Sequence, residues 1–348
     1  MARDKSPLMI WGEYLGVRAA TGLMTCFPTD QNLSTAGAIG SMFAKFNARR
    51  TARAAHNIAL SFPEMADAEV VDLAERSMRY MFQMFLVDPF VMPRLITPNN
   101  WANHLVIGDL GEAVEKLIRR EPALFITGHC GNWELLGYSL AVLGYPIAAV
   151  ARPLDNPKLN DWLMGVREAT GLRIITKFGA TTELEETLDR GGQIGFIADQ
   201  NAGDQGMFVP FFGRLASSYK SIGLLAMRYE VPVIAGFARR VDQTFRYELS
   251  CHDVITPEDW ADQPDPLYYI TARYNRAIES MIRSAPEQYL WLHRRWKSRP
   301  KHERQGKVMP KRLREKLESL PWMTDDEMTR IVHHSEVSSK RYAAEALA

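Results

Sequence analysis

The middle of the chain alternates apolar runs with helix-like segments, and this alternation limits the fold more than any other feature. Apolar runs of strand length occupy residues 123–128, 146–151, 172–176, 193–198 and 231–238. Helical patterns fill the intervals 132–143, 157–170, 181–190 and 217–229, and glycines stand where several of these helices should end. This rhythm predicts an α/β fold with a largely parallel central sheet covered by helices.

A histidine and a glutamate flank the turn after the first of these strands, in Gly128-His129-Cys130-Gly131-Asn132-Trp133-Glu134. Open α/β sheets bind ligands beyond the carboxyl ends of their strands. An imidazole can take a proton from a hydroxyl near neutral pH, and a carboxylate can orient it. Backbone N–H groups near Gly131 and Asn132 could face an oxyanion. The same residues also fit a capped turn in which His129 is merely packed.

The sequence offers no nucleophile beside His129, so we expect the acceptor substrate to supply one. Cys130 is adjacent, but neighbouring side chains on an extended segment point to opposite faces. The chain has no Gly-x-Ser-x-Gly elbow, no Gly-x-Gly-x-x-Gly and no Walker A sequence. Its three scattered cysteines form no metal or disulfide pattern and indicate a reducing compartment. We therefore expect neither a cofactor nor a metal.

A second polar pair, Asp199-Gln200, follows the apolar run 193–198. It is expected to hold the acceptor or to order the loops of the site, although it could simply end the strand. Residues 199–216 are expected to form a loop. Phe211 and Phe212 in this loop are expected to wall an acyl chain, because a soluble loop rarely needs so many aromatic side chains.

The first 100 residues are expected to form a helical, membrane-associating region. The apolar window 8–27 is interrupted by Glu13 and Arg18, whereas a spanning helix needs about 20 mostly apolar residues. An amphipathic helix in the membrane interface fits this window better, with an ordinary surface helix as the alternative. The basic residues between 45 and 53 could meet lipid or phosphate groups, or form a solvated face.

The C-terminal third begins with an expected strand at 245–250 and an expected helix at 266–284. From Arg294 and Arg295 onward the sequence becomes strongly basic and indicates an anionic surface or a phosphate site. Nucleic acid is the rival partner, but no recognised nucleic-acid-binding motif accompanies these residues. Residues 301–348 are expected to form a basic C-terminal helix and tail.

Six blocks of sequence resemble, in order, those of one known family. His129 and Glu134 lie in a His-x4-Glu signature that resembles that of the bacterial lipid A biosynthesis (lauroyl/myristoyl) acyltransferases, within the larger His-x4-Asp/Glu glycerolipid acyltransferase group. The other matching blocks are Asn57 with Phe62-Pro63-Glu64; Arg152-Pro153 with Asn156-Pro157, Arg167 and Gly171; Asp199-Gln200; Val209-Pro210-Phe211-Phe212-Gly213 with Ala216; and Pro286-Glu287-Gln288-Tyr289 with Trp291, His293-Arg294-Arg295, Lys297 and Arg299-Pro300.

The resemblance implies that residues 101–300 form an acyltransferase domain. Its expected donor is an acyl carrier protein thioester, and its expected acceptor is a hydroxyl of a glycolipid of the lipid A precursor type. His129 would deprotonate that hydroxyl and Glu134 would orient His129. Backbone N–H groups near Gly131 and Asn132, with Arg152, would hold the oxyanion.

Further expectations concern binding and location. Arg152, Asn156 and Arg167 would position phosphate or sugar groups of the acceptor, because a guanidinium is a planar fork of donors. Arg294 and Arg295 would bind anionic groups. The enzyme would work at the cytoplasmic face of the inner membrane, peripherally or weakly anchored. Three alternatives stay open: an acyl-CoA donor with another glycolipid such as a phosphatidylinositol mannoside, an esterase or thioesterase, and a non-catalytic lipid-binding protein.

Overall fold

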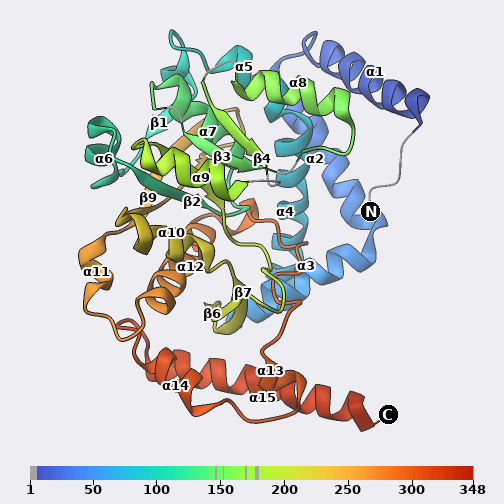
Figure 1. Cartoon of the computed structure of the whole chain (residues 1–348). Helices are drawn as coiled ribbons and strands as arrows, with labels where there is room; N and C mark the ends of the chain where they lie inside the picture. The colour runs from blue at the N-terminus through green and yellow to red at the C-terminus, as the bar shows by residue number, and fades with distance from the viewer. Residues whose placement is uncertain (1–5, 146, 152, 169–170, 177–179, 348) are drawn as a thin grey trace.

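A seven-stranded sheet forms the centre of the molecule, and helices cover both of its faces (Figure 1). The computed structural model describes residues 6–145, 147–151, 153–168, 171–176 and 180–347. The strand order is β1-β9-β8-β2-β5-β3-β4, and all neighbours are parallel except the antiparallel pair β8 and β9. The predicted α/β fold with a largely parallel sheet is therefore confirmed.

The sheet strands and the helices between them follow the predicted alternation closely. The strands are β1 (Leu105–Ile107), β2 (Ala123–Thr127), β3 (Ala148–Ala151), β4 (Arg173–Thr176), β5 (Gln193–Ile197), β8 (Val233–Arg240) and β9 (Tyr247–Ile255). The helices that accompany them are α6 (Ala113–Arg119), α7 (Trp133–Val142), α8 (Pro157–Glu168), α9 (Ala180–Asp189), α10 (Ser221–Tyr229), α11 (Pro257–Ala261) and α12 (Pro266–Ser284).

The side chains of β2 alternate between two apolar layers, as the period of a strand requires. Leu124 and Ile126 lie in the largest core cluster, together with residues of α10 and α12. Phe125 points the other way and packs with residues of α6 and α7. A strand buried on both faces explains why its sequence is a continuous apolar run.

The segment expected to be a loop contains a β-hairpin instead. Strands β6 (Met207–Phe211) and β7 (Arg214–Ser218) pair in antiparallel register across the two-residue turn Phe212-Gly213. Both turn residues have positive φ, 51° and 65°, as a type I′ hairpin turn requires. The predicted helix at 217–229 begins at Ser221 because β7 occupies its first residues.

Helices make up the N-terminal region, as predicted: α1 (Pro7–Met24), α2 (Thr29–Phe46), α3 (Ala48–Ser61), α4 (Asp67–Leu86) and α5 (Asp88–Leu95), followed by the short 3-10 turn η1 (Trp101–Asn103). Helix α4 runs beside α2 and lies against the α/β region (Figure 1). Among the described residues, no helix has both the length and the apolar content that crossing a bilayer requires.

The chain ends with the turn η2 (Pro286–Gln288) and three helices, α13 (Lys301–Arg304), α14 (Lys311–Glu318) and α15 (Asp325–Leu347). Helix α15 lies along α13, at the opposite end of the molecule from α1 (Figure 1). Ile331 of α15 is buried, and Ser335 donates to Glu303 of α13 at 3.0 Å. This helix is therefore docked against the protein rather than held loosely.

Candidate active site

His129 lies in the turn that leaves β2, and backbone hydrogen bonds fix that turn. The carbonyl of His129 accepts from Leu290 N at 3.0 Å, and Gly131 N donates to Gln288 O at 2.9 Å. Gly131 has a φ of 58°, and a Cβ there would stand 2.2 Å from the carbonyl oxygen of Ala238. Only glycine fits this position, so the sequence fixes the path of the chain next to His129.

Asp199, at the end of β5, is the carboxylate that contacts His129. Its Oδ1 lies 2.7 Å from His129 Nδ1. Asp199 is fully buried, whereas the His129 side chain is 16% exposed. A carboxylate at Nδ1 leaves Nε2 as the basic atom of the neutral ring. His129 is therefore arranged as a base that acts through Nε2.

Gln200 covers that nitrogen. Its amide Nε2 lies 3.1 Å from His129 Nε2 and donates to it when the ring proton is on Nδ1. A hydroxyl that enters the site would take the place of this amide at Nε2. The polar pair Asp199-Gln200 thus contacts both nitrogens of one imidazole.

The pKa values of the pair move in opposite directions. Burial lowers the pKa of His129, but the charge and hydrogen bond of Asp199, with a smaller effect of the Glu134 charge, raise it above its usual value. Burial raises the pKa of Asp199, but the charge of His129 and hydrogen bonds from its ring and backbone lower it below its usual value. These directions favour an imidazolium beside an aspartate, the state that forms when His129 accepts a proton.

Glu134, expected to orient His129, is engaged elsewhere, and that expectation was wrong. Both of its carboxylate oxygens accept hydrogen bonds from Arg167, at 2.8 Å to Nε and 2.5 Å to Nη2. The ring nitrogens of His129 are occupied by Asp199 and Gln200. Glu134 acts on His129 only through its charge. Arg167, expected to bind the acceptor, is held by this bidentate pair.

The two backbone N–H groups expected to form an oxyanion hole are also occupied. Gly131 N donates to Gln288 O, and Asn132 N donates to Ala238 O at 2.7 Å. They cannot serve a substrate without leaving these partners, so this expectation was wrong. Arg152, the other residue expected at the oxyanion, lies outside the described residues.

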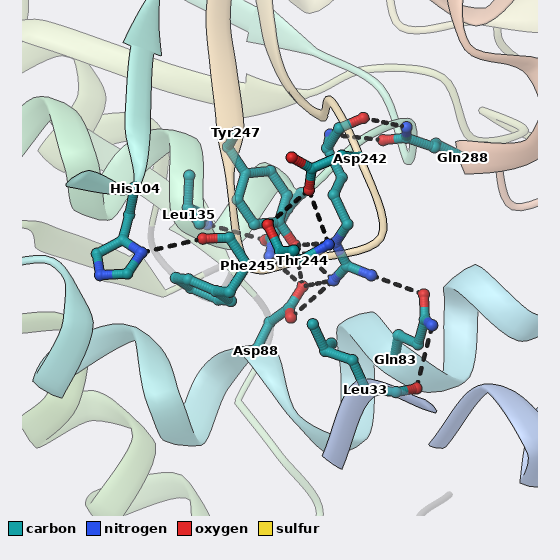
Figure 2. A network of polar contacts seen from close by, with 12 residues as sticks. Leu33, Gln83, Asp88, His104, Leu135, Asp242, Thr244, Phe245, Tyr247 and Gln288 are labelled. Carbon is teal, nitrogen blue, oxygen red and sulfur yellow. Dashed lines mark hydrogen bonds and ion pairs between the residues drawn. The ribbon is translucent and has the colours of Figure 1, made fainter. Parts of the chain in front are cut away.

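Asn132 ties the His129 turn to a buried polar network. Its Oδ1 accepts from Leu135 N at 2.9 Å and caps α7, and its Nδ2 donates to Asp88 at 2.8 Å. Asp88 also accepts two bonds from Arg240 at 2.8 Å, and Arg240 binds Gln83 and the hydroxyl of Tyr247 (Figure 2). Asn132 is therefore a structural residue rather than a substrate contact.

An apolar cavity of about 150 Å³ lies between α7 and the sheet. Its walls include Leu117, Phe125, Leu136, Leu140, Ile174 and Ile234. At one end it meets the ion pair of Glu134 and Arg167, and Trp133, whose ring centroid lies 4.7 Å from that of His129. Trp133 therefore stands between the imidazole and this apolar cavity.

Four other residues that were expected to bind substrate instead hold parts of the fold together. Asn156 caps α8 and donates to Ile10 O at 3.0 Å and to Glu13 at 2.8 Å, which ties α8 to α1. Phe211 and Phe212 are fully buried in the core around Trp291 and do not line the cavity. Arg295 is buried and donates to Ser218 and Asn275.

Arg295 does act on the site from a distance, since its positive charge contributes to the lowered pKa of Asp199. Arg294 is exposed and lies in a separate pocket with Arg53 and Trp296. Residues expected from one block of sequence thus have different environments in the folded chain.

The pairing of His129 with Asp199 could have been found from the predicted strands. In the parallel register of β2 and β5, Thr127 stands opposite Ile197. His129 and Asp199 each follow these residues by two positions, so they leave the same edge of the sheet together. A polar residue immediately after each neighbouring strand was the available signal.

The family described as bacterial lipid A biosynthesis acyltransferase matches residues 3–298. The chain belongs to this family. It is therefore an O-acyltransferase, as predicted.

The relatives of this chain in the family are named after different acyl groups. The chain is 25% identical to the lipid A biosynthesis myristoyltransferase of Escherichia coli (strain K12) over 311 residues, 86% of this chain and 90% of that protein. It is 26% identical over 269 residues to the lauroyltransferase of the same organism, and 26% identical over 265 residues to its palmitoleoyltransferase. These matches cover 75% of this chain, and 84% and 83% of the two relatives.

Proposed function

We propose that this acyltransferase moves a fatty acyl chain from an acyl carrier protein thioester to a hydroxyl of a lipid A precursor, at the cytoplasmic face of the inner membrane. One observation carries the proposal: an imidazole braced by a buried aspartate packs against Trp133, which lines an apolar cavity. The names of the relatives supply the acceptor class.

In the first step the acceptor hydroxyl replaces the Gln200 amide at His129 Nε2. The hydroxyl proton moves to Nε2 as the oxygen attacks the thioester carbonyl carbon. Asp199 then faces an imidazolium, and its charge stabilises that state. A general base of this kind contributes about 10²–10⁴-fold to the rate.

In the second step the tetrahedral intermediate collapses. The C–S bond breaks, the carbonyl re-forms, and the thiolate leaves with the proton from Nε2. The protein returns to its starting protonation state, and the acyl chain leaves as an ester of the acceptor. The apolar cavity that Trp133 lines would hold the chain of the donor during both steps.

A direct transfer is favoured over an acyl-enzyme because the adjacent thiol is a poor nucleophile. Cys130 is fully buried, and burial, with a smaller contribution from Asp199, raises its pKa well above the usual range. The reactive form of a cysteine is the thiolate. Steady-state kinetics should accordingly follow a ternary-complex pattern without a trapped acyl adduct.

Apolar side chains exposed on the N-terminal helices support the membrane location. Leu8, Trp11 and Leu15 of α1 are 85%, 48% and 57% exposed, and Phe46 at the end of α2 is 82% exposed. Trp and Leu side chains of this kind suit the interface between headgroups and acyl chains. We infer that α1 and the end of α2 rest on the membrane surface.

The proposal is tested by transfer assays on the purified full chain, with acyl carrier protein and CoA thioesters in competition for a lipid A precursor. Transfer from the carrier protein in preference to CoA supports the donor assignment. Fatty acid release that does not require the lipid acceptor would instead identify a thioesterase. Mass spectrometry of lipids from cells with and without the protein reports the acceptor and the acyl mass together.

A further inference from the structure

A second pocket, far richer in positive charge, opens between α3, β7, the 294–299 segment and α15. We propose that this basic pocket binds the phosphate group of a phosphate ester. Its volume is about 500 Å³. Its charged lining residues are Arg53, Arg214, Arg294, Lys297, Arg299 and Arg341, and the proposal does not depend on acyl transfer.

Arg214 is the residue that points most directly to a ligand. It is 5% exposed and lines the pocket, yet no carboxylate pairs with it in the part of the chain that the structure describes. Its Nη2 donates to Ser61 Oγ at 2.9 Å, its Nε has no partner there, and its guanidinium carbon lies 3.4 Å from the ring centroid of Trp296. A buried cation without a counter-ion is costly, and a bound anion removes that cost.

The neighbouring charges make the pocket attractive to an anion. Burial and the nearby charge of Arg299 lower the pKa of Arg214 to about 9. Burial, followed by the charges of Arg294, Arg49 and Arg50, lowers the pKa of Arg53. Each of these cations lowers the pKa of its neighbours, because like charges disfavour the charged form. A negatively charged ligand would raise those pKa values again.

Among the described residues, no carboxylate pairs with Arg53, Arg214, Arg294 or Lys297. Glu303 forms a buried bidentate pair with Arg299, at 2.7 and 2.8 Å, and neutralises that arginine alone. Burial, with the charges of Arg214 and His333, lowers the pKa of His334 to about 4, so that this lining residue is neutral at physiological pH. The uncompensated charge is therefore concentrated on Arg214, Arg53, Arg294 and Lys297.

The shape and chemistry of the pocket favour a phosphate ester over a polymer. Guanidinium groups from separate elements converge on one concave space, and their planar forks match the oxygens of a phosphate. Leu60, Val337 and Trp296 supply apolar surface beside these charges for the carbon part of an ester. Either a lipid headgroup or a soluble phosphate compound offers this chemistry.

The soluble form is tested with inorganic phosphate and the full-length protein, by thermal unfolding at constant ionic strength with chloride as reference. Phosphate should raise the melting temperature of the wild type in a concentration-dependent manner. The double variant Arg294→Gln/Lys297→Gln should bind at least about 10-fold more weakly, because each charge-assisted bond it loses is worth a factor of that order. Both side chains are on the accessible rim, so this variant avoids the folding risk of changing Arg214.

The lipid form is tested by flotation with vesicles of phosphatidylglycerol and, for comparison, phosphatidylcholine. Lys311→Gln is the matched control, because Lys311 is 89% exposed on α14 and does not line the pocket. Binding of phosphate that is weaker in the double variant than in Lys311→Gln supports a site open to soluble phosphate. Binding of anionic vesicles alone with the same dependence supports a headgroup site.

Two results would overturn the proposal. One is that neither probe binds the wild type at all. The other is that binding falls equally in Lys311→Gln and in the double variant, which would mean that general positive charge and no built pocket attracts the anion. Arg214→Met, provided that it melts cooperatively, should lose the phosphate-dependent shift as well.

Discussion

Asp199 and Asp88 are both buried aspartates beside the ends of sheet strands, and each faces a basic side chain. Asp88 accepts hydrogen bonds on both oxygens, from Arg240, Asn132 and Tyr247 (Figure 2). Asp199 binds His129 through Oδ1, while its Oδ2 has no hydrogen-bond partner among the described residues. Asp88 thus uses both carboxylate oxygens in hydrogen bonds, whereas Asp199 uses one.

The cations differ in the same way. Arg240 is 3% exposed, always charged, and bonded to Gln83, Tyr247 and Asp88. His129 is partly exposed, can change its protonation state, and has one nitrogen that only an amide covers. A saturated network stabilises a fold, whereas an incomplete one next to a cavity can exchange a proton with a ligand. The comparison thus distinguishes Asp88–Arg240, the structural pair, from Asp199–His129, the working pair that takes part in proton transfer.

The largest effect is expected at the working pair. His129→Ala removes the base, and transfer should fall by about 10²–10⁴-fold in kcat/KM. Its unfolding free energy should change less than that of an Arg240 variant, because water reaches the partly exposed space that the ring vacates. Transfer assays and denaturant unfolding check both parts, and unchanged transfer would remove His129 from the mechanism.

The next largest effect is expected at the structural pair. Arg240→Ala leaves Asp88 buried without its cation and should destabilise the protein by about 3–5 kcal/mol. Unfolding in urea measures this loss. A variant as stable as the wild type would contradict the structural role of this pair, since Asp88 would then tolerate the loss of its partner.

The pH dependence sharpens the distinction. His129 must be neutral to accept a proton, and its pKa is raised above the usual value, chiefly by Asp199 against the opposing effect of burial. The acid limb of kcat/KM should therefore lie above the ordinary histidine pKa of about 6.5, with a loss of about tenfold per pH unit below it. A rate profile with its acid limb near pH 4 would assign the limb to a carboxylate instead.

A smaller effect is expected at Asn132, which joins the two regions. Asn132→Ala removes the cap of α7 and one hydrogen bond to Asp88, so we expect a loss of about 1–3 kcal/mol. Its rate should fall far less than that of His129→Ala, because its side chain does not contact the imidazole. A rate as low as that of His129→Ala in a well-folded variant would give Asn132 a direct role.

The smallest effect is expected outside both regions, at Asn156. Asn156→Ala removes the cap of α8 and the bonds to α1, and should cost about 1 kcal/mol. Faster hydrogen exchange in α1 with little change in transfer from a soluble donor is the expected pattern. A large rise in the KM for the acceptor would restore the substrate-binding role that its sequence block suggests.

The fold could be predicted largely from sequence, because strands buried on both faces must be continuous apolar runs, as Leu124–Phe125–Ile126 is. The hairpin β6–β7 does not follow from the sequence pattern, because Phe211 and Phe212 suit the wall of a loop as well as the core that their side chains fill. Sequence spacing also favoured Glu134 as the partner of His129. Only the parallel register of β2 and β5 brings Asp199 to that position.

The oxyanion expectation failed for a similar reason. Backbone N–H groups at a turn are free only if no other segment pairs with them, and the distant segments around Gln288 and Ala238 take both. Long-range pairing of this kind leaves no local signal. The side-chain chemistry of His129 was evident from sequence, but its partners depended on contacts between remote parts of the chain.

The most direct test of the central claim is the pKa of His129, measured by NMR titration in the wild type, in Asp199→Asn and in Glu134→Gln. Asp199 contributes both a charge and a hydrogen bond, whereas Glu134 contributes a charge alone. The pKa should fall well below the wild-type value in Asp199→Asn and only slightly in Glu134→Gln. A larger fall in Glu134→Gln than in Asp199→Asn would contradict the assignment of Asp199 as the partner of His129.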